Sequence, residues 1–272
     1  MSITKAIIPV AGWGTRMLPI TKAIEKCMLP IGNRPLVDYV VQDCIAAGIT
    51  EIYFIVSSEA TQLRAYYERN PALDDYLIQK GKVEQLAQVT PIEGVSFHYV
   101  VQPAGGKYGT AVPVGMVNEY IDEGESVVVL MGDDFIYNTD GTNEIARLIE
   151  AAGDDGAMIG VNVEHEAVSK YGVLQLDEAG RYQRIVEKPN IDEAPSTLIN
   201  VSKYALPKRA IELARDIPVN PTRGEYELPD AINQYVTNGG VITVVEAKGQ
   251  FFDGGNVEGW LHANNVVIGK TI

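Results

Sequence analysis

The chain has 272 residues, of which 46% are hydrophobic and 21% are charged, a composition typical of a folded globular protein rather than a disordered one. Its 22 lysine and arginine residues against 36 aspartate and glutamate residues give a formal net charge of −14, which argues against a nucleic-acid partner. The sequence contains no run of about 18 apolar residues, so we expect no membrane-spanning helix and no membrane partner.

The first part of the sequence alternates apolar runs with segments of helical periodicity. Pro35 suits the first turn of a helix and Gly48 suits the position just beyond its end. We expect strands at 6–10, 52–56, 95–101, 127–131 and 157–163, and helices at 35–47, 60–69, 72–88 and 142–152. Buried strands separated by helices indicate a parallel sheet covered on both faces, with right-handed crossovers.

The second part of the sequence is richer in strands. We expect strands at 171–176, 182–187, 198–205 and 241–246, and helices at 226–237 and 256–268. The whole pattern predicts one α/β domain over 1–272, a Rossmann-like, doubly wound, mixed and mostly parallel sheet flanked by helices with a smaller β-rich part. Because ligands of such folds bind at the carboxyl ends of the strands, we expect a site after Val10, Val101 and Met131.

Two cysteines and the start of the chain indicate the compartment. Cys27 and Cys44 have no metal-ligand spacing and are too few for a disulfide framework. Met1 to Lys5 lacks the basic and apolar regions of a secretory signal. We therefore expect a protein of the reducing cytoplasm.

The loop from Ala11 to Arg16 is rich in glycine and precedes a second cation, Lys26. Glycines let backbone amides approach a phosphate, so the loop favours an anionic ligand. The loop lacks the dinucleotide fingerprint, because Met17 stands where the last glycine is needed, and it lacks the G-K-[ST] of a Walker loop. The alternative is a glycine turn beside solvated lysines.

The length of the motif decides between these interpretations. The chain carries Gly12, Gly14, Thr15, Arg16, Leu18 and Pro19, followed by Lys26, Met28, Leu29 and Pro30. This run resembles the G-x-G-T-R-x-L-P and P-K-x-M-L-P motifs of bacterial UTP–glucose-1-phosphate uridylyltransferases, in the sugar-nucleotide pyrophosphorylase superfamily. The chain departs from the pattern at Glu25, where proline is usual, and at Trp13, where a smaller residue is common.

The resemblance continues to about residue 265 and implies the role of each matching residue. It implies catalytic roles for Arg16 and Lys26, and nucleotide contacts at Ala11, Gly12, Gly14, Thr15, Gln102 and Gly109. It implies sugar-phosphate contacts at Gly172, Glu187, Lys188 and Val201, and Mg²⁺ ligands at Asp133 and Asp253. Residues 1–163 would then form the nucleotide-binding half, and 164–272 the sugar-binding and C-terminal half.

Two further matching segments depart from the family, each at two positions. Gly132 stands where proline is common, and Asp134 adds a carboxylate beside Asp133, so the sequence leaves open which of the two aspartates binds metal. Ser202 and Lys203 replace a more usual Gly-Arg pair.

The resemblance implies an enzyme that makes UDP-glucose and pyrophosphate from UTP and glucose 1-phosphate by Mg²⁺-assisted in-line displacement. The alternatives are a sugar-1-phosphate nucleotidyltransferase that uses dTTP or another triphosphate, a glycosyltransferase that consumes a nucleotide-sugar, and a nucleotide-sugar-binding regulator without turnover. The triphosphate loop argues against the glycosyltransferase, and the complete set of charged residues argues against the regulator. The family also implies a homodimer or homotetramer.

Overall fold

The computed structural model describes residues 3–271 and has one nine-stranded sheet at its centre. Its parallel part runs in the order β6-β1-β4-β5, formed by Ser126–Leu130, Lys5–Pro9, Glu51–Ser57 and Ser96–Gln102. This part carries the ends of β1, β5 and β6, after which the sequence predicts a ligand site.

The strand β11 (Leu198–Pro207) joins this parallel part to the rest of the sheet. It pairs antiparallel with β6, β8 and β9, while β12 pairs parallel with β8 and β10 pairs antiparallel with β9. The remaining bounds are Gly156–Asn162 for β8, Gly172–Leu176 for β9, Tyr182–Glu187 for β10 and Ile242–Glu246 for β12. The mixed sheet flanked by helices confirms the predicted fold class, and the predicted strands are shifted by at most two residues.

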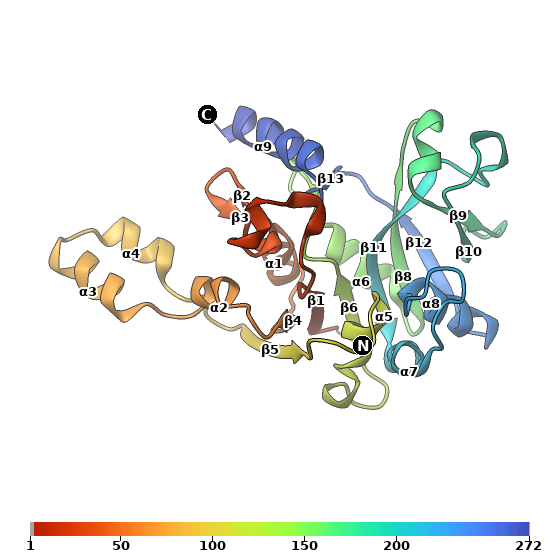
Figure 1. Cartoon of the computed structure of the whole chain (residues 1–272), viewed down its shortest axis with the longest axis horizontal. Coiled ribbons are helices and arrows are strands. Elements are labelled where there is room, and N and C mark those ends of the chain that lie inside the picture. The colour runs from red at the N-terminus through yellow and green to blue at the C-terminus, as the bar shows by residue number, and fades with distance from the viewer. Residues whose placement is uncertain (1–2, 272) are drawn as a thin grey trace.

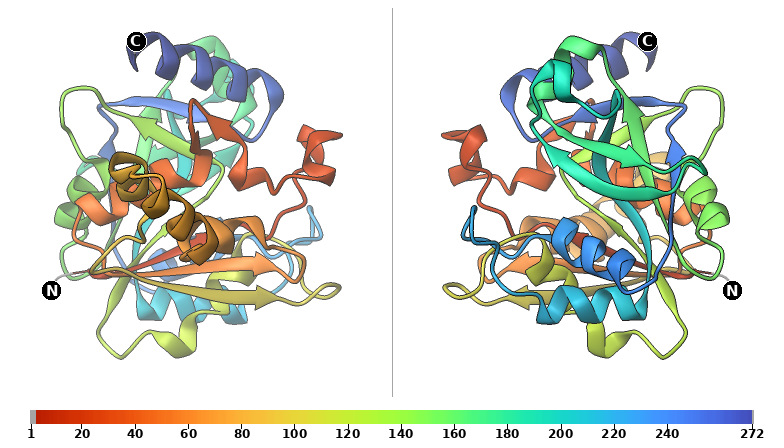
Figure 2. Two further views of the ribbon diagram at one scale, coloured as in Figure 1. Left: turned by 90° about the vertical axis from the view of Figure 1, so that its left-hand side faces the viewer. Right: turned by 90° about the vertical axis from the view of Figure 1, so that its right-hand side faces the viewer.

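Alternating side chains along the central strands belong to two hydrophobic clusters, one on each face of the sheet. Ala6 and Ile8 of β1 belong to a cluster that includes residues of α1 (Leu36–Ala46), α6 (Glu144–Ala152) and α9 (Val257–Thr271). Ile7 belongs to a second cluster with residues of α5 (Ala111–Gly115), α7 (Lys208–Asp216) and α8 (Leu228–Thr237). Figure 2 shows these two helical layers above and below the sheet. Burial on both faces explains why the central strands read as continuous apolar runs.

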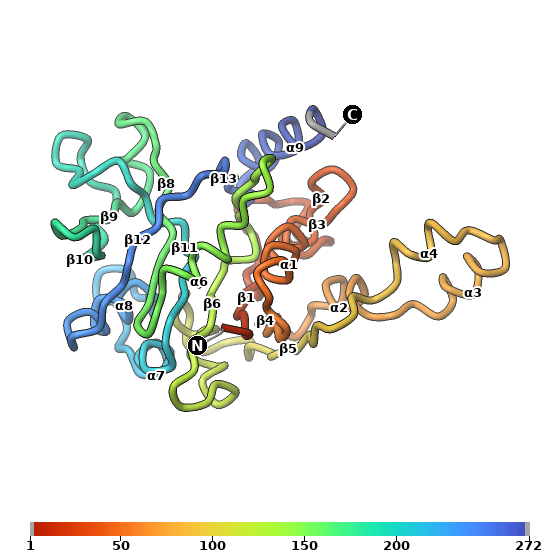
Figure 3. The backbone as a smooth tube through the Cα atoms, turned by 180° about the vertical axis from the view of Figure 1, so that it is seen from behind, coloured from red at the N-terminus to blue at the C-terminus, as the bar shows by residue number. Residues whose placement is uncertain are grey.

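One predicted helix is wrong in its length. The segment 72–88 forms two helices, α3 (Pro71–Gln79) and α4 (Val83–Val89), because Gly81 between them has φ +66° and turns the chain. With α2 (Gln62–Tyr67), these helices form an arm that projects from the body of the molecule (Figures 1 and 3).

Several elements have no counterpart in the prediction. They are α7, two short antiparallel pairs and, within residues 3–271, six short 3₁₀ helices. The pairs are β2 (Pro30–Ile31) with β3 (Arg34–Pro35), and β7 (Asp134–Tyr137) with β13 (Gln250–Asp253). The 3₁₀ helices are Thr15–Met17, Ile20–Lys22, Lys26–Met28, Asn118–Tyr120, His165–Lys170 and Ile191–Glu193. The pair β7–β13 brings the predicted site residue Asp253 close to Asp133, because Asp253 lies opposite Asp134, the residue that follows Asp133 in the chain. Within 3–271, no helix combines the length and the apolar character that crossing a membrane requires.

Candidate active site

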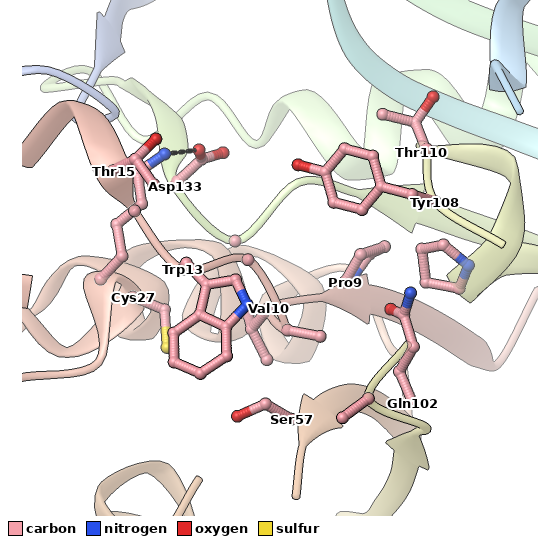
Figure 4. A pocket seen from close by; sticks show the side chains of 18 of the residues that line it. Pro9, Val10, Trp13, Thr15, Cys27, Ser57, Gln102, Tyr108, Thr110 and Asp133 are labelled. Carbon is pink, nitrogen blue, oxygen red and sulfur yellow. Dashed lines mark hydrogen bonds and ion pairs between the residues drawn. The ribbon is translucent and has the colours of Figure 1, made fainter. Parts of the chain in front are cut away.

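A pocket of about 610 Å³ opens where β1, β5 and β6 end. The segments after these strands line it, which is the arrangement expected for a parallel sheet. Among the predicted site residues, the pocket wall includes Ala11, Gly12, Gly14, Thr15, Arg16, Lys26, Gln102, Gly109 and Asp133. Figure 4 shows Asp133 and Gln102 on opposite sides of the pocket, with the exposed indole of Trp13 on the same side of the view as Asp133.

The glycine loop is folded back onto Lys26. Gly14 has φ +62°, and a Cβ there would lie 3.0 Å from the Cβ of Lys26 and 3.0 Å from Cγ2 of Thr21. The Thr21 hydroxyl donates a hydrogen bond of 2.9 Å to the Gly14 carbonyl and closes the turn. Only glycine adopts this positive φ and also leaves room for the side chains of Lys26 and Thr21 without strain. The close approach brings Arg16 and Lys26 to the same end of the pocket.

Three of the predicted charged residues converge around Gly255, and a fourth, Asp133, joins them through Lys26. A Cβ built on Gly255 would lie 2.7 Å from Asp253 Oδ1, 2.8 Å from Arg16 Nη2 and 3.0 Å from Lys26 Nζ. Lys26 Nζ also forms an ion pair with Asp133 Oδ2. Residues far apart in the sequence therefore form one cluster with two cations and two carboxylates.

Asp253 is held by the first turn of α9. Its Oδ1 accepts a hydrogen bond of 2.8 Å from the Gly255 amide, and its Oδ2 accepts one of 2.9 Å from the side-chain amide of Asn256. Asn256 in turn accepts from the Gly259 amide at 2.9 Å, so it caps the helix that follows. These contacts fix the carboxylate before any ligand binds.

The structure separates the two adjacent aspartates. Asp133 lines the pocket, whereas the buried Asp134 pairs with Lys203, whose side chain is only 4% exposed. Burial raises the pKa of Asp134 to about 7, even though Lys203 opposes the rise. Of these two carboxylates, Asp133 is therefore the one that a ligand in the pocket can reach.

Three of the four predicted sugar-phosphate residues, Gly172, Glu187 and Lys188, form a second group outside the pocket wall. Glu187 of β10 lies opposite Gly172 of β9, and a Cβ on Gly172 would come within 2.9 Å of Glu187 Oε2. Lys188 has φ +46°, and its amide donates a hydrogen bond of 2.9 Å to the Tyr171 carbonyl. Glu187 also forms an ion pair of 2.7 Å with Arg223. Val201 of β11 is only 3% exposed and packs in the hydrophobic cluster that also contains Val173 of β9.

Gly109 has a packing role that the sequence did not reveal. With φ +129°, it lies directly against Tyr226, whose carbonyl oxygen would be 2.3 Å from an added Cβ. The Tyr226 amide donates to Tyr108, and its carbonyl accepts from Ala111 at 2.9 Å, so the two segments run side by side. This contact brings Glu225 into the pocket wall.

Glu225, Gly255, Asn256 and Lys203 are further neighbours of the site, although none of them was predicted as a site residue. Gly255 and Asn256 had a usable signal, because an aspartate followed by glycine and asparagine favours local side-chain-to-backbone bonds before a helix. Lys203 had none, since its partner lies on a distant strand.

Comparisons with known proteins agree with this geometry. The nucleotidyl transferase family, whose enzymes generally use a divalent metal ion, matches residues 5–269. The UTP–glucose-1-phosphate uridylyltransferase of Mycoplasma pneumoniae is 32% identical over 277 residues, covering 99% of this chain and 94% of the relative.

Two solved structures have the same fold as this chain over nearly all of their length. One, described as UTP-bound and from Acinetobacter baumannii, has a TM-score of 0.88 and 31% identity, covering 97% of this chain and 93% of that one. A UDP-glucose pyrophosphorylase complexed with UDP-glucose has a TM-score of 0.83 and 28% identity, covering 98% of this chain and 99% of the other. The chain therefore belongs to the nucleotidyl transferase family and, within it, to the UTP–glucose-1-phosphate uridylyltransferases.

Proposed function

We propose that this enzyme transfers the uridylyl group of UTP to glucose 1-phosphate, forming UDP-glucose and pyrophosphate. The observation that carries the proposal is the convergence of Arg16, Lys26 and Asp253 around Gly255, beside the glycine loop, with Asp133 paired to Lys26. The relatives named for this activity, and the neighbours described with UTP and UDP-glucose, support the choice of substrates.

In the proposed reaction, an oxygen of the sugar phosphate attacks the α-phosphorus of UTP. A new P–O bond forms while the bond from the α-phosphorus to the bridging oxygen breaks, and that electron pair leaves with pyrophosphate. Because the nucleophile is already an anion, no side chain has to remove a proton. The protein must align the two substrates and neutralise their charge.

The two cations of the pocket serve this neutralisation. Two unit charges about 4 Å apart repel by roughly 4 kcal/mol at an effective dielectric of about 20, so bringing two phosphates together requires positive charge nearby. Arg16 and Lys26 would hold the triphosphate, and Lys26 would exchange its partner Asp133 for a phosphate oxygen. At the far side of the pocket, the amide of Gln102 would contact the base.

The second group of residues would hold the other substrate. We assign Lys188 to the phosphate of glucose 1-phosphate, and Gly172 and Glu187 to its sugar, as the resemblance implies. Residues 1–163 would then bind the nucleotide, while 164–272 would bind the sugar and contribute Asp253. The core position of Val201 argues for an indirect role behind the sugar.

Asp133 and Asp253 fit the chemistry of a magnesium site. Mg²⁺ prefers hard oxygen ligands and usually takes one or two carboxylates, with substrate phosphates and water completing its shell. Within 3–271, no group of three histidine, cysteine, aspartate or glutamate side chains is suited to hold a metal, so substrate oxygens would have to complete the site. When bound, the ion would stabilise negative charge on the reacting phosphate oxygens.

A substrate panel tests the proposal directly. UTP, dTTP and other triphosphates would each be mixed with several sugar 1-phosphates and Mg²⁺, and pyrophosphate release would be measured. We expect the highest kcat/KM with UTP and glucose 1-phosphate. Faster reaction with dTTP would favour the thymidylyl alternative, and absence of pyrophosphate release with every pair would refute the proposal.

Two variants test the assigned residues. Lys26→Ala and Asp133→Ala should each lose at least about tenfold in turnover, equivalent to about 1.4 kcal/mol in the barrier. Lys80→Ala and Asp75→Ala make the same changes on the exposed arm and should leave turnover unchanged. Near-normal turnover of either site variant would refute the role of that residue.

The compartment and the oligomeric state of the enzyme are two further proposals. We propose a reducing cytoplasm as its compartment, in keeping with the unpaired and buried Cys27 and Cys44. The homodimer or homotetramer that the family implies stays a prediction, which light scattering of the purified protein would test.

A further inference from the structure

Glu25, directly before Lys26, caps a helix that is distant from it in the sequence. Its Oε1 accepts hydrogen bonds of 2.6 Å from the amides of Thr61 and Gln62, and its Oε2 accepts one of 3.3 Å from the Leu63 amide. These are the first amides of α2, which have no partners inside the helix. Thr61, at the N-cap position of α2, makes no side-chain capping bond of its own. The carboxylate of Glu25 therefore takes the place of a local cap.

Gln62 makes the connection reciprocal. Its side-chain oxygen accepts a hydrogen bond of 2.9 Å from the Glu25 amide, and its side-chain nitrogen donates one of 3.1 Å to the Ala23 carbonyl. A negative carboxylate at a helix N-terminus also interacts favourably with the helix dipole. The segment 23–25 is thus joined to the start of α2 through backbone and side-chain groups on both sides.

The next residue in the chain is Lys26, so this connection fixes the backbone position from which the Lys26 side chain extends. The same side chain is restrained along its length by Gly14, which packs against its Cβ, and at its tip by Asp133. Its exposed fraction is only 13%. A shift of the Glu25 backbone would therefore move the ammonium group away from the cluster at Gly255.

We propose that Glu25 is a positioning residue, which docks the segment 23–26 onto α2 and thereby sets the reach of Lys26 towards the triphosphate. The inference rests on the proposed role of Lys26. Glu25 itself would touch neither substrate, because its carboxylate is directed to the amides of Thr61, Gln62 and Leu63.

The proposal predicts a selective defect in triphosphate binding. In Glu25→Ala, we expect the Kd of MgUTP, measured by calorimetry without sugar phosphate, to rise about tenfold. The KM for UTP should rise in parallel, whereas the KM for glucose 1-phosphate should change by less than about twofold. Glu25→Gln keeps one acceptor oxygen without the charge, so it should restore part of the affinity.

Two further variants separate positioning from a loss of folding. Gln62→Ala removes the reciprocal bonds from the other side and should weaken MgUTP binding in the same direction. Glu68→Gln removes one negative charge at the other end of α2, where Glu68 pairs with the exposed Arg64, and should leave binding unchanged. Circular dichroism and the unfolding temperature would show whether each variant is folded.

Each outcome is decisive for the proposal. Normal MgUTP affinity of folded Glu25→Ala would overturn it, and so would an equal rise of both KM values. Failure of the wild-type enzyme to release pyrophosphate from UTP and glucose 1-phosphate would instead overturn the proposed function, while the calorimetric comparison would still decide the role of Glu25.

Discussion

Lys203 and Asp134 form a largely buried ion pair next to the two carboxylates that we propose as metal ligands, because Asp134 follows Asp133 and lies opposite Asp253. Lys203 also donates a hydrogen bond of 3.3 Å to the Asp134 carbonyl. It reaches this position through an irregularity of β11, where the register shifts between Asn200 and Tyr204 and Ser202 has φ +51°. The pair connects the main sheet to β7, and through β7 to Asp253.

Removing the lysine should destabilise the protein strongly. In Lys203→Met, the buried Asp134 would lose its partner, and breaking a buried ion pair on one side costs about 3–5 kcal/mol. Urea denaturation would measure this change. The double variant Lys203→Met/Asp134→Asn should recover most of the loss, because no unpaired charge remains. Equal loss of stability in the single and double variants would contradict this explanation.

Asp43 on α1 should make the stability depend on pH. Burial raises the pKa of this carboxyl from 3.8 to about 6, and the positive charge of Lys203 only partly offsets the effect. The folded state therefore binds the proton more tightly than the unfolded state, so stability falls as the pH rises from about 4 through 6. Above pH 6 the folded state carries the cost of the charged Asp43.

Asp43→Asn removes this cost without changing the size of the side chain. At pH 7.5 we expect the variant to unfold a few degrees above the wild type, corresponding to about 1 kcal/mol. Near pH 4 the difference should disappear, because Asp43 is protonated in the folded wild type. Circular dichroism recorded during thermal unfolding at both pH values measures this difference in unfolding temperature. A difference independent of pH would exclude the charge of Asp43 as its cause.

The fold was predictable from the sequence where burial is local and repetitive. Strands such as β4 and β6 have continuous apolar runs because both of their faces are covered. Helix α7 was missed although Ala210, Ile211 and Ala214 lie on one face, since the charged residues between them hide the period. The pair β7–β13 joins segments more than a hundred residues apart, and no local pattern encodes such a pairing.

The candidate site was likewise predictable where its residues lie in contiguous motifs, and not where its contacts cross the sheet. The glycine loop, its cations and both aspartates follow from contiguous motifs, and the structure brings Arg16, Lys26, Asp133 and Asp253 together. The choice between Asp133 and Asp134 depends on which carboxylate faces Lys203, a contact made across the sheet. The role of Glu25 likewise depends on a helix that starts at residue 62.

Removal of divalent ions should abolish turnover. With excess EDTA, we expect no pyrophosphate release from UTP and glucose 1-phosphate, and addition of Mg²⁺ beyond the chelator should restore it. Asp253→Asn should raise the Mg²⁺ concentration for half-maximal rate at least about tenfold, because an amide is a weaker ligand than a carboxylate for a hard cation. Asp75→Asn on the exposed arm is the matched control. Full turnover in EDTA would refute a metal-assisted reaction.

Gly255→Ala tests the convergence of charges with the smallest possible change. The added methyl group would lie within about 3 Å of Asp253 Oδ1, Arg16 Nη2 and Lys26 Nζ, closer than nonbonded atoms normally approach. These atoms end flexible side chains, so the charged groups should move aside while the fold persists. We expect kcat/KM for UTP to fall at least about tenfold, with an unfolding temperature close to that of the wild type.

Gly269→Ala provides the control for this substitution, because within the described part of the chain no atom beyond its chain neighbours and the backbone of α9 lies within 4 Å of the added methyl group. Its turnover should be unchanged, and its stability should rise slightly because alanine favours a helix by about 0.5–1 kcal/mol over glycine. A loss of turnover in Gly255→Ala with unchanged unfolding would locate the defect at the charged cluster. Normal turnover would mean that Arg16, Lys26 and Asp253 do not act from the positions around Gly255, and the proposed mechanism would lose its geometric basis.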